Sequence, residues 1–286
     1  ISTFSFMGED WAAVDVVVGA ENLASVGAAL AASDIAVICV PADVDSAVLA
    51  APFIRRVEEL GVPAIIFINR IDSAQHRIAE IVSALQTYSR HHIVLREVPI
   101  REGSTITGFV DLVSERAWKF EEGKRSVMID MPEGVKDREA AARTELLESY
   151  ADLDDHLMEE LIEDRQPLAG EVYAIAAKAL RENAVIECFI GSASKGHGIN
   201  RLMKSLRHDA PGVEETRARF GAGTVAVGAL ADQLKHLGKA VLVRALEGTV
   251  GGGGRLGGSD VGSITDLDAK SPLGQLQAGQ IGLAVK

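Results

Sequence analysis

A short polar segment after a run of apolar residues carries side chains suited to ligand recognition. It reads Asn69-Arg70-Ile71-Asp72 and follows the apolar residues 64–68. An Asn side chain offers both a donor and an acceptor, and a carboxylate can accept two N–H bonds at once. Such a pair suits guanine, whose N1–H and exocyclic amine form a paired donor edge. An Asx-rich turn after a strand is the alternative interpretation of the same residues.

A second polar segment stands in the same kind of position much later in the chain. It follows the apolar residues 185–190 and reads Gly191-Ser192-Ala193-Ser194-Lys195. Both apolar runs are typical of strands that are buried on both faces of a parallel sheet. Open α/β sheets bind their ligands at the C-terminal ends of such strands, so the two segments are expected to meet at one site.

The elements around these segments alternate between strand and helix, which predicts right-handed crossovers and a parallel sheet. Strands are expected over 35–41, 64–69 and 185–190, and helices over 21–32, 46–60, 74–88 and 198–206. Two more strands are predicted over 4–7 and 11–18, with Asp15 in the second.

Two other parts of the chain break this alternation. Paired strands over 92–99 and 105–112 and over 117–120 and 126–130, then helices over 137–163 and 170–183, predict an inserted α+β unit. Short strands at regular spacing follow over 225–230, 239–246, 249–256, 261–267 and 280–285, which predicts a β-barrel. The glycine run 251–254 lacks a following Lys-Ser/Thr and a helix, so we expect a hairpin turn there.

The order of these motifs resembles elongation factor G. Asn69-Arg70-Ile71-Asp72 is similar to the Asn-Lys-x-Asp motif of GTPases, and the segment 191–199 resembles their Ser-Ala element as elongation factor G carries it. The insert and the tail segments 244–250 and 276–282 also resemble that family. The likeness covers nearly the whole chain and is nearest to divergent bacterial paralogues.

The resemblance implies an α/β fold with four parts. An incomplete P-loop-type G domain would occupy residues 1–96 and 183–212, an inserted α+β subdomain 97–182, and a β-barrel 222–286. It also implies a cytoplasmic translation factor that binds GTP or GDP with Mg²⁺ and couples GTP hydrolysis to ribosome action. Its partners would be the RNA and protein of the ribosome.

The resemblance further implies roles for single residues. Asp72 would accept guanine N1–H and the amine, and Asn69 would tie its loop to neighbouring backbone. The stems of Arg70 and Lys195 would cover the two faces of the base, while backbone N–H groups of the Ser192-Ala193-Ser194 segment contact guanine O6. Asp15 would act through water on Mg²⁺, or it is an ordinary strand-end aspartate.

Three departures from the family pattern limit this interpretation. No Gly-x-x-x-x-Gly-Lys-Ser/Thr segment occurs, the family's Asp-x-Pro-Gly-His is replaced by residues 15–20, and no His lies near Gly19. The phosphate loop provides most of the triphosphate binding energy. We therefore expect a fragment that lacks the N-terminal loop, or a pseudo-GTPase, and a chain that is inactive alone. No catalytic residue is assigned.

Composition restricts the alternatives. A net charge of -12 disfavours a protein that coats nucleic acid generally, and no apolar run is long enough for a membrane span. Cys39 and Cys188 lie in apolar, strand-like segments with no metal-ligand spacing around them, so we expect buried reduced thiols. A non-catalytic ribosome- or protein-binding module with a vestigial nucleotide site is the second hypothesis. An unrelated α/β enzyme is the third, without a nucleophile–base pair or dinucleotide glycine fingerprint to support it.

Overall fold

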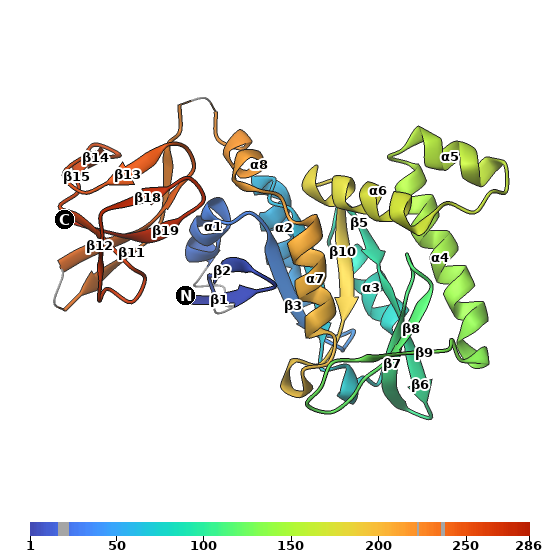
Figure 1. Cartoon of the computed structure of the whole chain (residues 1–286). Coiled ribbons are helices and arrows are strands. Elements are labelled where there is room, and N and C mark those ends of the chain that lie inside the picture. Colours follow the sequence, from blue (N-terminus) through green and yellow to red (C-terminus); the bar gives the residue numbers. More distant parts are fainter. Residues whose placement is uncertain (17–22, 222, 236–237) are drawn as a thin grey trace. The chain divides into compact units, whose positions relative to one another are not determined.

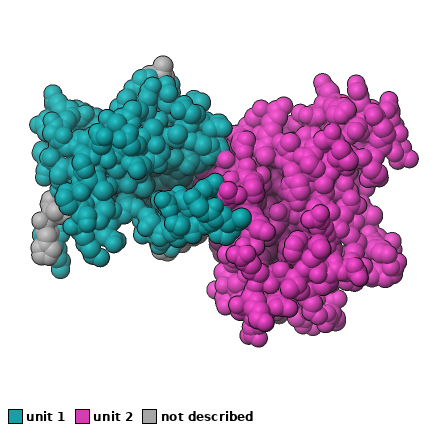
Figure 2. All heavy atoms as spheres, in the orientation of Figure 1, with its two compact units in different colours: residues 1–34, 60–62, 211–286 teal, residues 35–59, 63–210 magenta. Residues whose placement is uncertain are grey.

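The chain divides into two compact units (Figures 1 and 2). The structure is a computed structural model that describes residues 1–16, 23–221, 223–235 and 238–286. Unit 1 comprises residues 1–34, 60–62 and 211–286, and unit 2 comprises residues 35–59 and 63–210.

The centre of unit 2 is a parallel sheet, as the alternating pattern predicts. Its strands are β3 (Ala36–Pro41), β4 (Ala64–Asn69), β10 (Val185–Ile190) and β5 (His92–Leu95), in the order β3-β4-β10-β5 (Figure 1). Every residue of β10 is buried, as is every residue of β4 except the last. This burial explains why both strands are continuous apolar runs apart from one glutamate in β10. Cys188 in β10 is buried as expected, but the expected burial of Cys39 is wrong, because Cys39 lies exposed on β3, an edge strand of this sheet.

Helices follow three of these parallel strands along the chain. They are α2 (Ala47–Leu60), α3 (Ile78–Gln86) and α7 (Ile199–Asp209), with a single 3₁₀ turn η2 (Ile71–Ser73) between β4 and α3. The apolar stripe of α2 is buried, and the helix is followed by Gly61 at φ 62°, a left-handed conformation that glycine adopts at little cost.

The predicted insert contains an antiparallel sheet and three helices, all in unit 2. The sheet runs β6 (Glu97–Glu102), β7 (Thr105–Asp111), β8 (Arg116–Lys119) and β9 (Val127–Ile129), in sequence order. A 3₁₀ turn η3 (Glu133–Val135) leads into α4 (Lys136–Ala151), which is followed by α5 (Asp155–Ile162) and α6 (Ala169–Arg181).

The expectation of one helix over 137–163 is wrong. The helix breaks between α4 and α5 at Asp154, whose backbone is extended and whose carboxylate accepts the Leu157 N–H at 3.1 Å. This is an N-cap, so the acidic residue begins a new helix instead of continuing the old one.

Unit 1 begins with a hairpin of β1 (Ser2–Phe6) and β2 (Glu9–Ala13). The predicted strand 11–18 is shorter in the structure: β2 ends at Ala13, Asp15 follows it, and residues 17–18 lie outside the described part of the chain. Helix α1 (Leu23–Ala32) covers most of the predicted helix 21–32, whose first two residues also lie outside that part. A helix that the sequence did not indicate, α8 (Val213–Ala218), packs near α1 through Thr216, which bonds to Asp34.

The C-terminal part of unit 1 is an antiparallel β domain. A five-stranded sheet has the order β11-β12-β19-β16-β17, and two pairs, β13-β18 and β14-β15, accompany it. The strands are β11 (Ala226–Leu234), β12 (Gly238–Ala245), β13 (Thr249–Gly251), β14 (Arg255–Leu256), β15 (Ser259–Asp260), β16 (Ser263–Thr265), β17 (Pro272–Leu273), β18 (Gln275–Gln277) and β19 (Ile281–Val285). The predicted strand 249–256 is split at the glycine run, where the chain turns.

Candidate functional site

The two polar segments lie side by side at the C-terminal ends of β4 and β10. The strands are paired in register at Ile68 and Ile190. Beyond that pair the Gly191 N–H donates to the Ile68 carbonyl at 2.9 Å, and the Ile71 N–H donates to the Gly191 carbonyl at 3.2 Å. The parallel ladder thus continues into the loops and brings them together.

Asn69 joins the two loops through its side chain. Its Oδ1 accepts the Arg70 N–H at 2.8 Å and the Ala193 N–H at 2.9 Å, across 124 residues of sequence. Arg70 has φ 61° and ψ 36°, a left-handed conformation that is uncommon for a residue with a Cβ. The hydrogen bond from the Arg70 N–H to Asn69 Oδ1 offsets part of the cost of this backbone conformation.

Asp72 and Lys195 bring opposite charges to the outer side of the same loops. Lys195 Nζ lies 3.7 Å from Asp72 Oδ2, and their side chains are 49% and 28% exposed. Three effects hold the pKa of Asp72 below its usual value: the hydrogen bond from the Ser192 hydroxyl, the backbone N–H of Asp72 itself, and the charge of Lys195. Burial acts in the opposite direction and does not outweigh them. Asp72 is therefore an ionised, solvent-reachable acceptor at neutral pH.

The second loop is closed tightly on itself. Ser192 and His197 exchange two backbone hydrogen bonds, both 3.0 Å long. A Cβ at Gly191 would lie 2.3 Å from the His197 carbonyl oxygen and 2.5 Å from the Phe67 ring, so only glycine fits there. Gly198, at φ 76°, faces the same limit, because its Cβ would lie 2.3 Å from the Ile190 carbonyl oxygen.

The predicted site residues thus divide into two groups. The structure brings Asn69, Asp72, Ala193 and Lys195 together, and the Ser192 and Ser194 hydroxyls lie 3.2 Å apart in the same loop. Arg70 is exposed beside them. Asp15 is an exposed residue of unit 1 and its predicted role with Mg²⁺ stays a prediction. Among the residues that the structure describes, no group of three or more His, Cys, Asp or Glu could hold a metal ion.

Residues of the inserted sheet also reach these loops, which the sequence analysis did not anticipate. The Phe120 ring, just after β8, stacks on the His197 ring with centroids 4.5 Å apart and planes 2° apart. Burial, with the nearby Lys195 charge, lowers the pKa of His197. No local pattern marks this contact, because its partners belong to separate segments.

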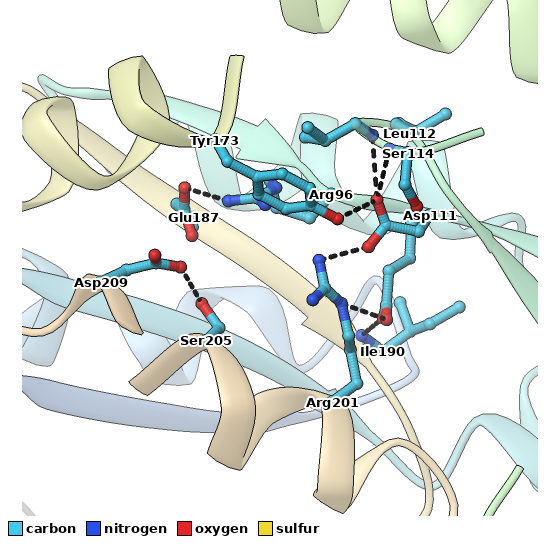
Figure 3. A network of polar contacts seen from close by, with 12 residues as sticks. Arg96, Asp111, Leu112, Ser114, Tyr173, Glu187, Ile190, Arg201, Ser205 and Asp209 are labelled. Atoms are coloured by element: carbon cyan, nitrogen blue, oxygen red, sulfur yellow. Dashed lines mark hydrogen bonds and ion pairs between the residues drawn. The ribbon is translucent and has the colours of Figure 1, made fainter. Parts of the chain in front are cut away.

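A buried polar network lies behind the loops (Figure 3). Its charged members are Arg96, Glu97, Asp111, Glu187, Arg201 and Asp209. The sequence does carry one signal for it: Arg96 and Glu97 interrupt the strand-like residues 92–99, and Glu187 interrupts the apolar run 185–190. Charged residues inside apolar strands are rarely buried unless they are paired.

This arrangement can bind a planar polar ligand. Asp72 supplies a charged acceptor, Lys195 a flexible cation with an apolar stem, and Arg70 a second such stem on the other loop. A ligand edge with two adjacent donors would satisfy the Asp72 carboxylate.

The sequence of this chain is similar to those of elongation factors and their GTP-binding domain. Residues 22–212 match the family described as the elongation factor Tu GTP binding domain. The chain is 30% identical over 264 residues to an elongation factor G-like protein of Synechocystis sp., covering 90% of this chain and 40% of that protein. It is 27% identical over 154 residues to elongation factor G of Thermotoga maritima, covering 53% of this chain and 22% of that protein.

A solved structure shares the fold. A crystal structure of a protein from Thermus thermophilus superposes with a TM-score of 0.79 at 19% identity, covering all of this chain and 43% of that one. The chain spans about two fifths or less of the length of the curated relatives that it matches. Within its described residues, no helix has the length and apolar character needed to cross a membrane.

Proposed function

We propose, from the premise that this chain belongs to the family of elongation factor Tu GTP-binding domains, that its two joined loops recognise the guanine base of GTP or GDP. The supporting observation is the meeting of Asp72, Asn69 and the 191–198 loop at the C-terminal edge of a parallel sheet. Crevices at that edge are where open α/β sheets bind ligands.

Guanine fits the donors and acceptors of the site. Its N1–H and exocyclic amine form two parallel donors, and an ionised Asp72 can accept both. Adenine presents an acceptor at N1, which would leave the carboxylate unpaired and face it with a lone pair. In this proposal Lys195 leaves Asp72 when the base arrives, and its stem and that of Arg70 cover the two faces of the ring.

The Ala193 N–H has a different part in this proposal. It already donates to Asn69, so it holds the loops together, and the Lys195 N–H donates to the Ser192 carbonyl at 3.2 Å. The guanine O6 would therefore be contacted by the neighbouring backbone N–H of Ser194. This assigns Asn69 to positioning and Asp72 to base selection.

The finer functional assignment rests on the relatives. We include in the proposal that the full-length gene product is a cytoplasmic translational GTPase of the elongation factor G type, which binds the RNA and protein of the ribosome. Asp15 would then belong to its Mg²⁺ site. Mg²⁺ commonly takes one or two carboxylates plus waters and substrate phosphates, so a single protein carboxylate suits it.

A non-catalytic module is the second candidate. The sequence of residues 15–20 favours it, because this segment lacks the Pro and the His of the family's Asp-x-Pro-Gly-His motif. Such a protein would bind the ribosome or another protein without turning over nucleotide.

Two measurements on the full-length gene product decide between these functions. Calorimetric titration should give tighter binding of GDP than of ADP, and equal affinities would reject guanine recognition. Ribosome-stimulated release of phosphate from GTP would remove the non-catalytic candidate. Co-sedimentation with ribosomes that is independent of nucleotide, without turnover, would establish it instead.

A further inference from the structure

The start of the 191–198 loop is attached to the inserted sheet through Glu97. Strand β5 pairs with β10 only as far as Leu95 and Cys188. The next residue, Arg96, still donates its N–H to the Cys188 carbonyl at 3.0 Å, but its own carbonyl accepts the Leu112 N–H at 3.0 Å. The Ile190 N–H has therefore lost the strand partner it would meet next in a parallel ladder.

Glu97 replaces that missing strand partner. Its Oε2 accepts the Ile190 N–H at 2.9 Å, and Glu97 is fully buried as the first residue of β6. A buried backbone N–H without an acceptor is rare and costly, so this side chain fixes where β10 ends. Ile190 directly precedes Gly191, the first residue of the loop.

The other end of the loop is attached through Arg201. This residue lies in the first turn of α7, three residues after Gly198. Its guanidinium pairs with the Asp111 carboxylate at the end of β7 (Figure 3). Its Nε lies 4.0 Å from Glu97 Oε1. Arg201 therefore connects α7 to two acidic side chains of the inserted sheet.

Asp111 is itself held rigidly. Its Oδ1 accepts hydrogen bonds from the Ser114 N–H at 2.9 Å and from the Tyr173 hydroxyl of α6 at 3.1 Å (Figure 3). It also accepts the Val113 N–H at 3.0 Å. The charges of Arg201 and Arg96 keep the pKa of Asp111 low despite its burial. Asp111 is thus a fixed anion that holds Arg201 in place.

A third contact lies between these two ends. Phe120 stacks on His197, and the Phe120 N–H donates to the Thr107 carbonyl of β7 at 2.8 Å. The stacked ring is thereby anchored to the inserted sheet. Three side chains from the insert thus contact the loop or the residues that flank it: Glu97 binds Ile190 just before it, Phe120 stacks on His197 within it, and Asp111 pairs with Arg201 just after it.

We infer that Glu97, Asp111 and Phe120 are positioning residues through which the inserted sheet holds the 191–198 loop and thereby sets the affinity for guanine nucleotide. The inference rests on the proposed function, in which this loop contacts the base. It goes further by assigning the inserted sheet a part in nucleotide affinity.

The first test measures the loop without nucleotide. Backbone hydrogen exchange of the full 286-residue chain is followed in wild type and in Glu97→Ala, Asp111→Asn and Phe120→Ala. Asn at 111 keeps the acceptor oxygen for Val113 and Ser114 but loses the charge that holds Arg201. Amides of residues 190–198 should exchange about tenfold faster, the change expected for losing one such interaction.

Internal standards separate positioning from general destabilisation. The amides of β4 report the stability of unit 2, and Glu102→Gln, an exposed carboxylate on the same strand as Glu97, is the matched control variant. Glu97→Gln should restore slow exchange, because Gln keeps an oxygen acceptor for the Ile190 N–H. Unchanged loop exchange, or an equal increase in β4 and in the loop, would overturn the inference.

The second test separates this inference from the proposed function. In the full-length gene product, GDP should dissociate about tenfold faster from Asp111→Asn than from wild type or Glu102→Gln. If the wild type prefers GDP to ADP but Asp111→Asn releases GDP at the wild-type rate, the inference is overturned and the proposed function stands. If the wild type does not prefer GDP to ADP, both the proposed function and the nucleotide part of the inference are overturned.

Discussion

The Asn69 side chain accepts a hydrogen bond from the Ala193 backbone at 2.9 Å, and this bond helps to join two loops across 124 residues of sequence. An entire inserted unit, with its own sheet and helices, separates the two residues along the chain. The bond can form because β4 and β10 are neighbours in the parallel sheet and end at the same edge.

Replacing Asn69 by Ala should loosen both loops. The Arg70 and Ala193 N–H groups lose their acceptor, and because both residues are exposed, water can replace it and the cost should be about 0.5–1.5 kcal/mol per hydrogen bond. Urea unfolding and hydrogen exchange of residues 190–198 measure the effect. Asn69→Asp keeps an acceptor for both groups and should stay near wild type, so equal loss in the two variants would contradict this role.

Replacing Asp72 by Asn should remove base selectivity with little effect on the fold. The Asp72 side chain is 28% exposed, so its charge is placed to contact the proposed ligand and contributes little to packing in the core. The preference of the full-length gene product for GDP over ADP should fall by about 1.5–3 kcal/mol, the range for a hydrogen bond to a charged group. Asp268→Asn, an exposed carboxylate in the β domain, is the control, and an undiminished preference in Asp72→Asn would reject the assignment.

The two glycines that bracket His197 offer a matched pair of variants. Both have positive φ, 70° at Gly196 and 76° at Gly198, but only Gly198 has backbone atoms close to the Cβ position. Gly196→Ala should cost about 1–2 kcal/mol from backbone strain alone. Gly198→Ala should cost roughly a further 1–3 kcal/mol from the clash with the Ile190 carbonyl. Equal free energies of unfolding would show that the loop relaxes freely.

Glu97 should make stability depend on pH. Burial raises the pKa of Glu97 from 4.5 to about 8, with Arg201 opposing it, so the folded protein binds this proton more tightly than the unfolded chain does. The resulting stability is complete below about pH 4.5 and is lost as the pH rises through about 8. A tenfold change in proton affinity corresponds to about 1.4 kcal/mol, so the loss is on the order of a few kcal/mol.

Glu97→Gln tests this dependence, because Gln stays neutral. The charged and titratable groups that interact with Glu97 remain in the variant: Arg96, Asp111, Cys188 and Arg201. Urea unfolding should give similar stability for wild type and variant at about pH 5, and greater stability for the variant at about pH 9. A difference that does not grow with pH would contradict the shifted pKa.

Replacing only one member of the buried Arg96–Glu187 ion pair should lower the free energy of unfolding more than replacing both. Arg96 is fully buried, contacts Glu187, and lies near the Tyr173 and Phe189 rings. Arg96→Met leaves the Glu187 carboxylate without its counter-charge, which should cost about 3–5 kcal/mol. The double variant Arg96→Met with Glu187→Gln should be more stable than the single one in urea unfolding. A double variant that is less stable would show that the charges act independently.

The sequence by itself determined the strands 64–69 and 185–190 and the polar segments that follow them. These are local patterns: a continuous apolar run sets a buried strand, and the polar residues after it must lie at the sheet edge. The inserted α+β unit and the β domain were predictable for the same reason, since strand spacing and turn residues repeat within short windows. The break at Asp154 was missed because an aspartate inside a helical pattern can also be a cap.

Only the tertiary structure decided that Glu97, Asp111 and Phe120 hold the loop from the inserted sheet. Each has its partner in a distant segment, and Glu97 binds an N–H that becomes free only because β5 leaves the sheet at Arg96. Side-chain chemistry alone would place both acidic residues in water, where most carboxylates lie. Their burial follows from the packing of two sheets and α7 around them, which no local pattern in the chain encodes.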